Sequence, residues 1–128
     1  MNSLTIIAVA SGGAIGATLR LVINSAVNKS FIHALPLGTL AVNLIGSLLI
    51  GMLFAYFHFN TTLSPHLKTF MVTGILGALT TYSTFAIESF FFLEAGHYGQ
   101  AFANMALNVF GTILMAGIGY ILILKLGN

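Results

Sequence analysis

Hydrophobic residues fill four long stretches of the chain, and shorter polar segments separate them. The four stretches are roughly residues 4–23, 37–57, 67–93 and 101–126. About 20 mostly apolar residues are enough for an α-helix to cross a bilayer. Pro36 and Pro65 each stand where the next helix is expected to begin, a position that suits proline. The pattern predicts an all-α membrane protein with four transmembrane helices in a single domain, residues 1–128.

The composition agrees with this prediction and narrows the possible functions. Of the 128 residues, 58% are hydrophobic and only 5% are charged, whereas about a quarter of a soluble domain is charged. The mean hydropathy is +1.03. There is no cysteine, so disulfides and thiolate metal sites are excluded. A formal net charge of +2 is too small to indicate a nucleic-acid partner.

The residues that catalysis usually needs are scarce. Glu88 and Glu94 are the only acidic residues, and six positions along a helix would point them in different directions. A carboxylate pair for acid–base chemistry is therefore not expected. No Ser-His-acid set and no phosphate-binding glycine loop can be recognised. We expect that the chain is not an enzyme.

The basic residues are divided evenly between the two ends of the predicted bundle. Lys68 and Lys125 fall on the side of the N-terminus, and Arg20 and Lys29 fall on the other. Membrane orientation is normally set by an excess of Lys and Arg in cytoplasmic loops. Two against two gives no such excess. Either the protein simply has few charges, or both orientations are made and pair as an antiparallel, dual-topology homodimer.

Polar residues recur along one face of two of the predicted helices. They are Thr39, Asn43 and Ser47 in the second helix, and Asn104, Asn108 and Thr112 in the fourth. A spacing of four residues places each set on a single face. Such residues often only join helices, through hydrogen bonds of about 1 kcal/mol each. Alternatively they line an ion path, because the two N–H donors of Asn43 and the hydroxyls could replace the hydration shell of an ion.

The third predicted helix carries an unusual sequence, GILGALTTYSTFAIE, at residues 74–88. Gly74 and Gly77, followed by Thr80 and Thr81, predict that the backbone unwinds near the middle of the membrane. Unwound backbone is tolerated there only where its polar groups meet protein, a cavity or an ion. Carbonyl groups exposed at such breaks can bind cations.

Two further features of the sequence concern packing. Gly12 and Gly16 form a GxxxG motif, and Ser47 and Gly51 have the same spacing, so close helix packing is expected. Tyr82 and Phe85 lie three residues apart on one face after the predicted break. Their spacing alone favours core packing, although the positive rim of an aromatic ring can also meet an anion.

Four segments together resemble the Fluc, or CrcB-type, fluoride channels. They are GGAIGATLR (12–20), PLGTLAVNLIGSLLIG (36–51), GILGALTTYSTFAIE (74–88) and the NxxLNVFGT pattern at 104–112. The resemblance covers nearly the whole chain in order. It implies an antiparallel homodimer among the lipids of the bacterial inner membrane, with two fluoride pathways. Such channels passively release fluoride that entered the cell as HF.

The resemblance also implies roles for individual residues. Asn43 matches a pore-lining asparagine, and Tyr82 and Phe85 match two phenylalanines whose ring edges line the path. Ser83 and Thr84 fall in the same segment, and Asn104, Asn108 and Thr112 correspond to a polar track on the last helix. Position 82 departs from the family, which usually has Phe there.

A structural sodium ion and two vestibule residues complete these implied sites. Gly77 and Thr80 match residues whose backbone carbonyls, from both subunits, hold a central sodium. Arg20 and Glu88 align with positions near the vestibules. Two other functions remain open, a small multidrug-type proton-coupled exporter and a non-transporting membrane assembly subunit. The exporter is expected to need a carboxylate in its first helix, and the first predicted helix has none.

Overall fold

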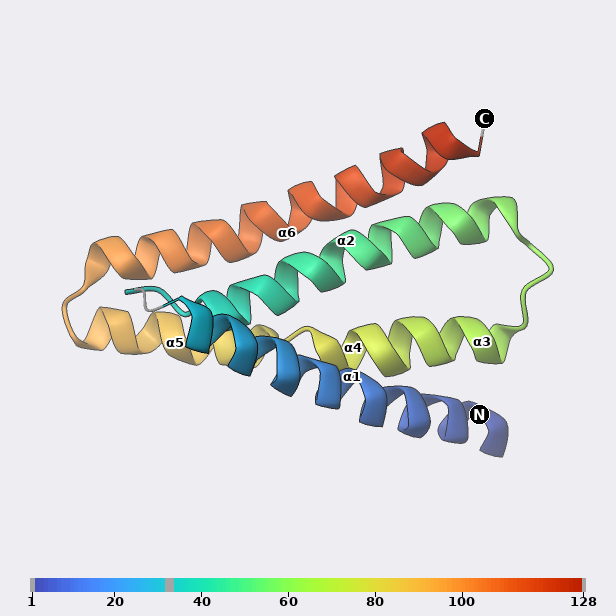
Figure 1. Cartoon of the computed structure of the whole chain (residues 1–128), viewed down its shortest axis with the longest axis horizontal. Coiled ribbons are helices and arrows are strands. Elements are labelled where there is room, and N and C mark those ends of the chain that lie inside the picture. Colours follow the sequence, from blue (N-terminus) through green and yellow to red (C-terminus); the bar gives the residue numbers. More distant parts are fainter. Residues whose placement is uncertain (1, 32–33, 128) are drawn as a thin grey trace.

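The computed structural model describes residues 2–31 and 34–127, and these form four long helical segments (Figure 1). The segments are α1 (Ser3–Ser30), α2 (Leu37–Phe59), a segmented third stretch over Pro65–Glu94, and α6 (Tyr98–Leu126). All four are long and apolar enough to cross a membrane. The predicted all-helical fold with four apolar spans is therefore confirmed.

The first helix is longer than the sequence predicted, and it includes two asparagines that were expected in the following loop. The expected end was residue 23, whereas α1 continues to Ser30. The Asn28 amide donates to Asn24 Oδ1 at 2.6 Å, and its own oxygen accepts from the Gly38 backbone N–H at 3.0 Å. Asn28 therefore satisfies a free donor at the start of α2. Arg20 consequently lies ten residues before the end of α1 instead of in its last turn.

The third segment is broken, as predicted, and consists of four helical pieces. They are α3 (Pro65–Thr69), the π-helix η1 (Phe70–Leu76), α4 (Gly77–Leu79) and α5 (Tyr82–Glu94). The backbone leaves the helix at Thr80 (ψ 156°) and Thr81 (φ −148°, ψ 109°). The expectation that the unwinding includes the glycines was wrong, since Gly74 lies in η1 and Gly77 is helical. Threonine can form this break because extended backbone is open to any residue.

Close approach of backbones joins the helices in two pairs. A Cβ at Gly16 would overlap the carbonyl of Ile75, and Gly12 lies against Gly74, so α1 packs directly on η1. A Cβ at Gly51 would overlap the carbonyl of Ala116, which brings α2 onto α6. The close packing predicted from the glycines is confirmed. Ser47, which was paired with Gly51 in the sequence, lines a cavity instead.

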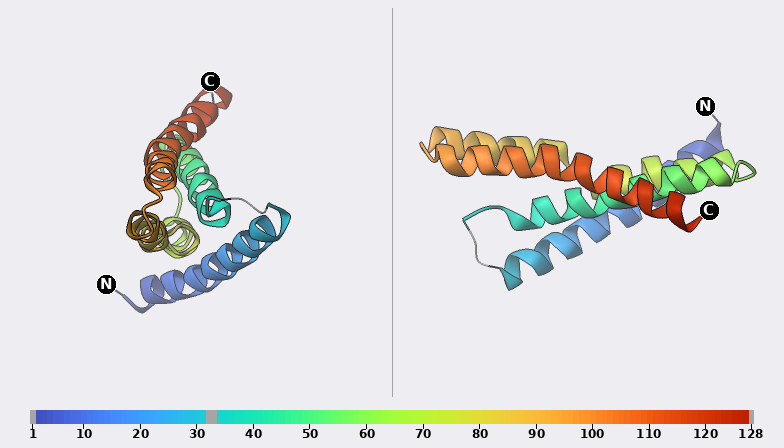
Figure 2. Two further views of the ribbon diagram at one scale, coloured as in Figure 1. Left: turned by 90° about the vertical axis from the view of Figure 1, so that its left-hand side faces the viewer. Right: turned by 90° about the horizontal axis from the view of Figure 1, so that it is seen from above.

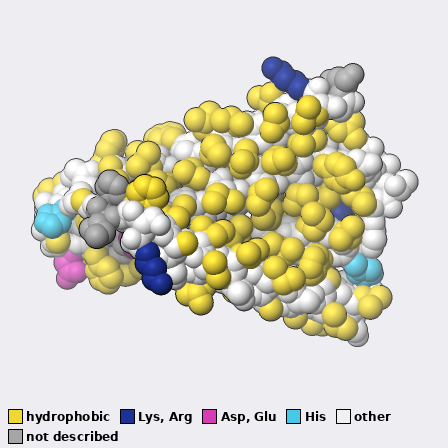
Figure 3. Space-filling view, in the orientation of Figure 1, with side chains coloured by type: hydrophobic (Ala, Val, Ile, Leu, Met, Phe, Trp, Pro, Cys, Tyr) yellow, Lys and Arg dark blue, Asp and Glu magenta, His cyan; other side chains and the backbone are white. Residues whose placement is uncertain are grey.

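The bundle is open on one side. Among the described residues α1 and α6 do not contact each other, and Figure 2 shows them diverging at the edges of the molecule. The buried apolar cluster is small, consisting of Val42, Leu76 and Leu79. Hydrophobic side chains spread over the middle of the face in Figure 3, with charged groups near its two ends. The N-terminus, the loop after α2 and the C-terminus lie at one end (Figure 1).

Candidate functional site

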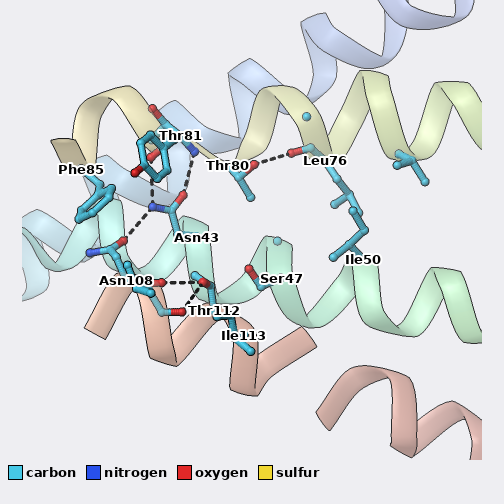
Figure 4. A pocket seen from close by; sticks show the side chains of 15 residues that line it. Asn43, Ser47, Ile50, Leu76, Thr80, Thr81, Phe85, Asn108, Thr112 and Ile113 are labelled. Carbon is cyan, nitrogen blue, oxygen red and sulfur yellow. Dashed lines mark hydrogen bonds between the residues drawn. The ribbon is translucent and has the colours of Figure 1, made fainter. Parts of the chain in front are cut away.

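The break in the third segment is held by one side chain of α2. The Thr81 backbone N–H donates to Asn43 Oδ1 at 2.8 Å, and the Asn43 amide donates to the Thr81 carbonyl at 3.1 Å. Both residues are 6% exposed. In an apolar interior the two backbone groups would be costly without partners. Asn43 replaces the hydrogen bonds that the helix gives up at Thr81 (Figure 4).

The same amide begins a longer chain of hydrogen bonds. Asn43 Nδ2 also donates to Asn108 Oδ1 on α6 at 2.9 Å. The Asn108 amide in turn donates to the carbonyl and Oδ1 of Asn104, at 2.9 and 3.2 Å. The predicted face on the fourth helix is thus confirmed as a connected line of side chains. Thr112 extends it by donating to the Asn108 carbonyl at 2.6 Å.

This chain of hydrogen bonds returns to the third segment. Asn104 Nδ2 donates to Ser89 Oγ at 3.0 Å, and the Ser89 hydroxyl donates to the Phe85 carbonyl at 2.9 Å. The path therefore begins at the Thr81 N–H and ends at the Phe85 carbonyl, four residues later. A backbone N–H can only donate and a carbonyl can only accept. In each asparagine along the path, the side-chain oxygen accepts a hydrogen bond and the amide nitrogen donates the next one, so all the bonds run in the same direction.

A cavity of about 430 Å³ opens beside the break, and we call it the central cavity. Many of the residues that the sequence singled out meet on its wall. They are Asn43, Ser47, Gly77, Thr80, Tyr82, Phe85, Asn108 and Thr112. Gly46 makes room here, because a Cβ on α2 at that position would overlap the Thr80 methyl group. Figure 4 shows most of these side chains around the gap between α2, α6 and the break.

The two aromatic residues form an edge-to-face pair at the central cavity. The rings of Tyr82 and Phe85 have centroids 5.1 Å apart and an angle of 79° between their planes. Phe85 is 6% exposed, whereas Tyr82 is 77% exposed. Phe85 is therefore packed inside the chain, whereas Tyr82 is largely exposed beside the central cavity.

Asn43 does not offer the free donors that the sequence suggested. Its amide has two hydrogens, and the structure uses them for the Thr81 carbonyl and for Asn108. An ion in the central cavity would have to compete with these bonds. The residue lines the cavity, but its evident task is to hold the break.

The remaining predicted residues lie outside the central cavity. The Thr39 hydroxyl donates to Glu88 Oε1 at 2.7 Å, and Glu88 Oε2 is buried without a hydrogen-bond partner among the described residues. Glu88 lines a separate cavity of about 600 Å³ beside the end of α1. Arg20 forms no ion pair within residues 2–31 and 34–127, so the two vestibule candidates are not joined. Ser83 is exposed, and Thr84 accepts from the Thr81 hydroxyl at 2.8 Å.

The break also leaves backbone oxygens available. Outside the regular helical bonds of the described residues, no backbone N–H donates to the carbonyls of Gly77 and Thr80. The Thr80 hydroxyl donates backward to the Leu76 carbonyl at 3.1 Å, so it does not occupy them either. No group of three or more His, Asp or Glu side chains suitable for a metal occurs among these residues. A cation at this place would have to be held by neutral oxygens.

Comparison with known proteins places the chain in a family. The family described as "CrcB-like protein, Camphor Resistance (CrcB)" matches residues 7–120. The chain belongs to the CrcB family. A relative from Sulfurimonas denitrificans is 54% identical over 123 residues, which is 96% of this chain and 95% of the relative. The resemblance seen in the sequence is therefore confirmed.

Other relatives are nearly as long and carry the same name. The protein from Nautilia profundicola is 46% identical, with 91% of both chains covered, and one from Campylobacter jejuni is 46% identical, with 92% of this chain and 96% of the relative covered. All three relatives are named "Fluoride-specific ion channel FluC". Because these matches cover 91–96% of this chain, the stretch that contains the break lies within the part that is similar to the relatives.

Sequence reasoning missed Ser89, which receives the hydrogen bond from Asn104. Thr81, Phe85 and Ser89 are spaced by four residues, so the rule that found the other two polar faces applies to this face as well. The phenylalanine in the middle obscured it, because its side chain is apolar and the network uses its backbone carbonyl.

Proposed function

We propose that the protein is a fluoride-selective channel that passively exports fluoride from the cytoplasm and so relieves fluoride toxicity. The observation that carries this proposal is the 54% identity, over 96% of the chain, to a protein named as a fluoride-specific ion channel. A channel function also agrees with the expectation that the chain is not an enzyme. The four apolar spans support a multi-pass membrane protein.

The central cavity has chemistry that suits a small, strongly hydrated anion. An ion can leave water only where polar groups replace its hydration shell. Ser47 and Tyr82 bring hydroxyls to the wall, and Phe85 brings an aromatic ring. No acidic residue among the described ones lines this cavity, so they place no fixed negative charge beside an anion there. The predicted fluoride pathway, including Thr39, Ser83, Thr84 and Asn104 as more distant members, remains part of this proposal.

We further propose an antiparallel, dual-topology homodimer in the inner, or plasma, membrane of a bacterium. The open side of the bundle and the 77% exposure of Tyr82 beside the central cavity support a second copy at this face. Lys29 lies in the last turn of α1, and Lys125 lies in the last turn of α6 at the opposite end. This even distribution suits a chain that inserts both ways. Lipid surrounds the remaining apolar surface.

A sodium ion at the centre of this dimer is the proposed structural cofactor. The carbonyls of Gly77 and Thr80 fit the role, since no backbone N–H outside the regular helical bonds of the described residues donates to them. Two oxygens from each copy would give a small hard cation neutral oxygen ligands, as such cations prefer. The ion would place a positive charge at the dimer centre and would connect the breaks of the two copies.

Fluoride efflux from liposomes tests the proposed function. Purified protein reconstituted into vesicles loaded with potassium fluoride should release fluoride when a potassium ionophore is added at neutral pH. As the matched control, vesicles loaded with potassium chloride should release no more chloride than protein-free vesicles do. Release that requires an imposed proton gradient would favour an exporter instead. No release by correctly folded protein would leave only an assembly role.

The orientation of the chain can be tested with added lysines. Thr61→Lys with Thr62→Lys places positive charge at one end, and Ser30→Lys with Gly99→Lys places it at the other; all four positions are exposed. Each double variant should insert one way only and lose fluoride efflux when it is expressed alone. Co-expression of the two should restore efflux. Full activity of either variant in a single orientation contradicts the antiparallel dimer.

Crystallography of the purified protein tests the sodium proposal. We expect one cation on the axis between two copies, bound by the carbonyls of Gly77 and Thr80, and replaceable by a heavier monovalent cation that can be located by anomalous scattering. A water molecule at that position, with ordinary hydrogen-bond distances and no exchange for the heavier ion, would argue against a cation site.

A further inference from the structure

Most hydrogen-bond donors on the wall of the central cavity are already committed inside the chain. The Thr80 hydroxyl donates to the Leu76 carbonyl at 3.1 Å, and the Thr112 hydroxyl donates to the Asn108 carbonyl at 2.6 Å. The Thr81 hydroxyl donates to Thr84 at 2.8 Å. Each of these side chains would have to break a bond before it could bind an anion.

The amides on the same wall are committed as well. Asn43 uses its two hydrogens for the Thr81 carbonyl and for Asn108. Asn108 donates to two oxygens of Asn104. These side chains are nearly buried, at 6% and 4% exposure. A buried acceptor left without its donor destabilises the structure, so an anion gains little by drawing these amides away.

Ser47 is the exception on α2. It lies one turn after Asn43 and lines the central cavity, yet its hydroxyl has no hydrogen bond within residues 2–31 and 34–127. Helical serines and threonines commonly donate to the carbonyl four residues earlier, as Thr18, Ser89 and Thr112 do here. The Ser47 hydroxyl is therefore a donor that can turn to a ligand without breaking a bond (Figure 4).

We propose that Ser47 is a fluoride-binding donor of the central cavity, while Asn43 serves to position the break. This inference rests on the proposed function, because fluoride is the anion assigned to the cavity. The wall of the same cavity also carries Ile50, Val72 and Leu76, and apolar surroundings strengthen a hydrogen bond to an anion. The Tyr82 phenol is the other hydroxyl on this wall without a bond in the described part of the chain, and it is far more exposed.

Substitution of Ser47 tests this assignment. Ser47→Ala should lower the rate of fluoride efflux about tenfold, as expected for loss of a hydrogen bond to a charged group. It should also raise the fluoride concentration for half-maximal flux, which a purely structural role would not change. Ser47→Thr keeps a hydroxyl and should recover most of the rate. Ser25→Ala, the same change at an exposed serine of α1 outside the cavity, should behave like the parent protein.

The outcomes separate this inference from the proposed function. One outcome is that the parent protein releases fluoride and Ser47→Ala matches it in rate and in half-maximal concentration. That result overturns the role of Ser47 and leaves the channel function intact. A parent protein that releases no fluoride overturns the channel itself. If Ser47→Ala aggregates on gel filtration, Ser47→Thr decides, because a folded Ser47→Thr protein with tenfold lower flux also contradicts the proposal.

Discussion

The structure depends on the pair of hydrogen bonds between the Asn43 side chain and the Thr81 backbone. A chain that leaves its helix in the middle of a membrane exposes an N–H and a carbonyl where water cannot pair with them. Each buried group without a partner costs about 1–3 kcal/mol. A carboxamide can satisfy both at once, since it carries a donor and an acceptor side by side. One asparagine on α2 therefore removes most of the free-energy cost of the break in the third segment.

The other features of the site follow from that break. Because Thr80 and Thr81 are extended, the carbonyls of Gly77 and Thr80 receive no backbone hydrogen bond outside the regular helical ones of the described residues, and a new helix, α5, begins at Tyr82. The new helix presents Tyr82 and Phe85 to the central cavity. The second hydrogen of Asn43 connects the break to Asn108 and so to α6. The three elements around the cavity are thus held by a single network, and the hydroxyl of Ser47 is left outside it.

The sequence predicted the elements well, because lipid imposes strong limits on composition and length. The four spans follow from apolar length, and the contacts at Gly16 and Gly51 follow from small residues. The break was expected in the right segment, but it lies at Thr80 and Thr81 and not at the glycines. What it could not predict depended on which side chain reaches which backbone group. Asn28, near the end of α1, accepts a hydrogen bond from Gly38 at the start of α2. Asn43 donates its amide hydrogens to the Thr81 carbonyl and to Asn108. Both involve partners distant in sequence, and no local pattern reveals them.

Amide hydrogen exchange at Thr81 tests the central role of Asn43 most directly. In the parent protein, reconstituted in lipid nanodiscs and followed by NMR, the Thr81 amide should exchange as slowly as amides in the middle of α2. Asn43→Leu, which removes both the acceptor of the Thr81 N–H and the donor to the Thr81 carbonyl, should accelerate that exchange at least tenfold, as expected for a loss of about 1.4 kcal/mol or more. Asn60→Leu, the same change directly after α2, should leave it unaltered. Fast exchange at Thr81 in the parent protein, at the rate of the loop after α2, would contradict the account.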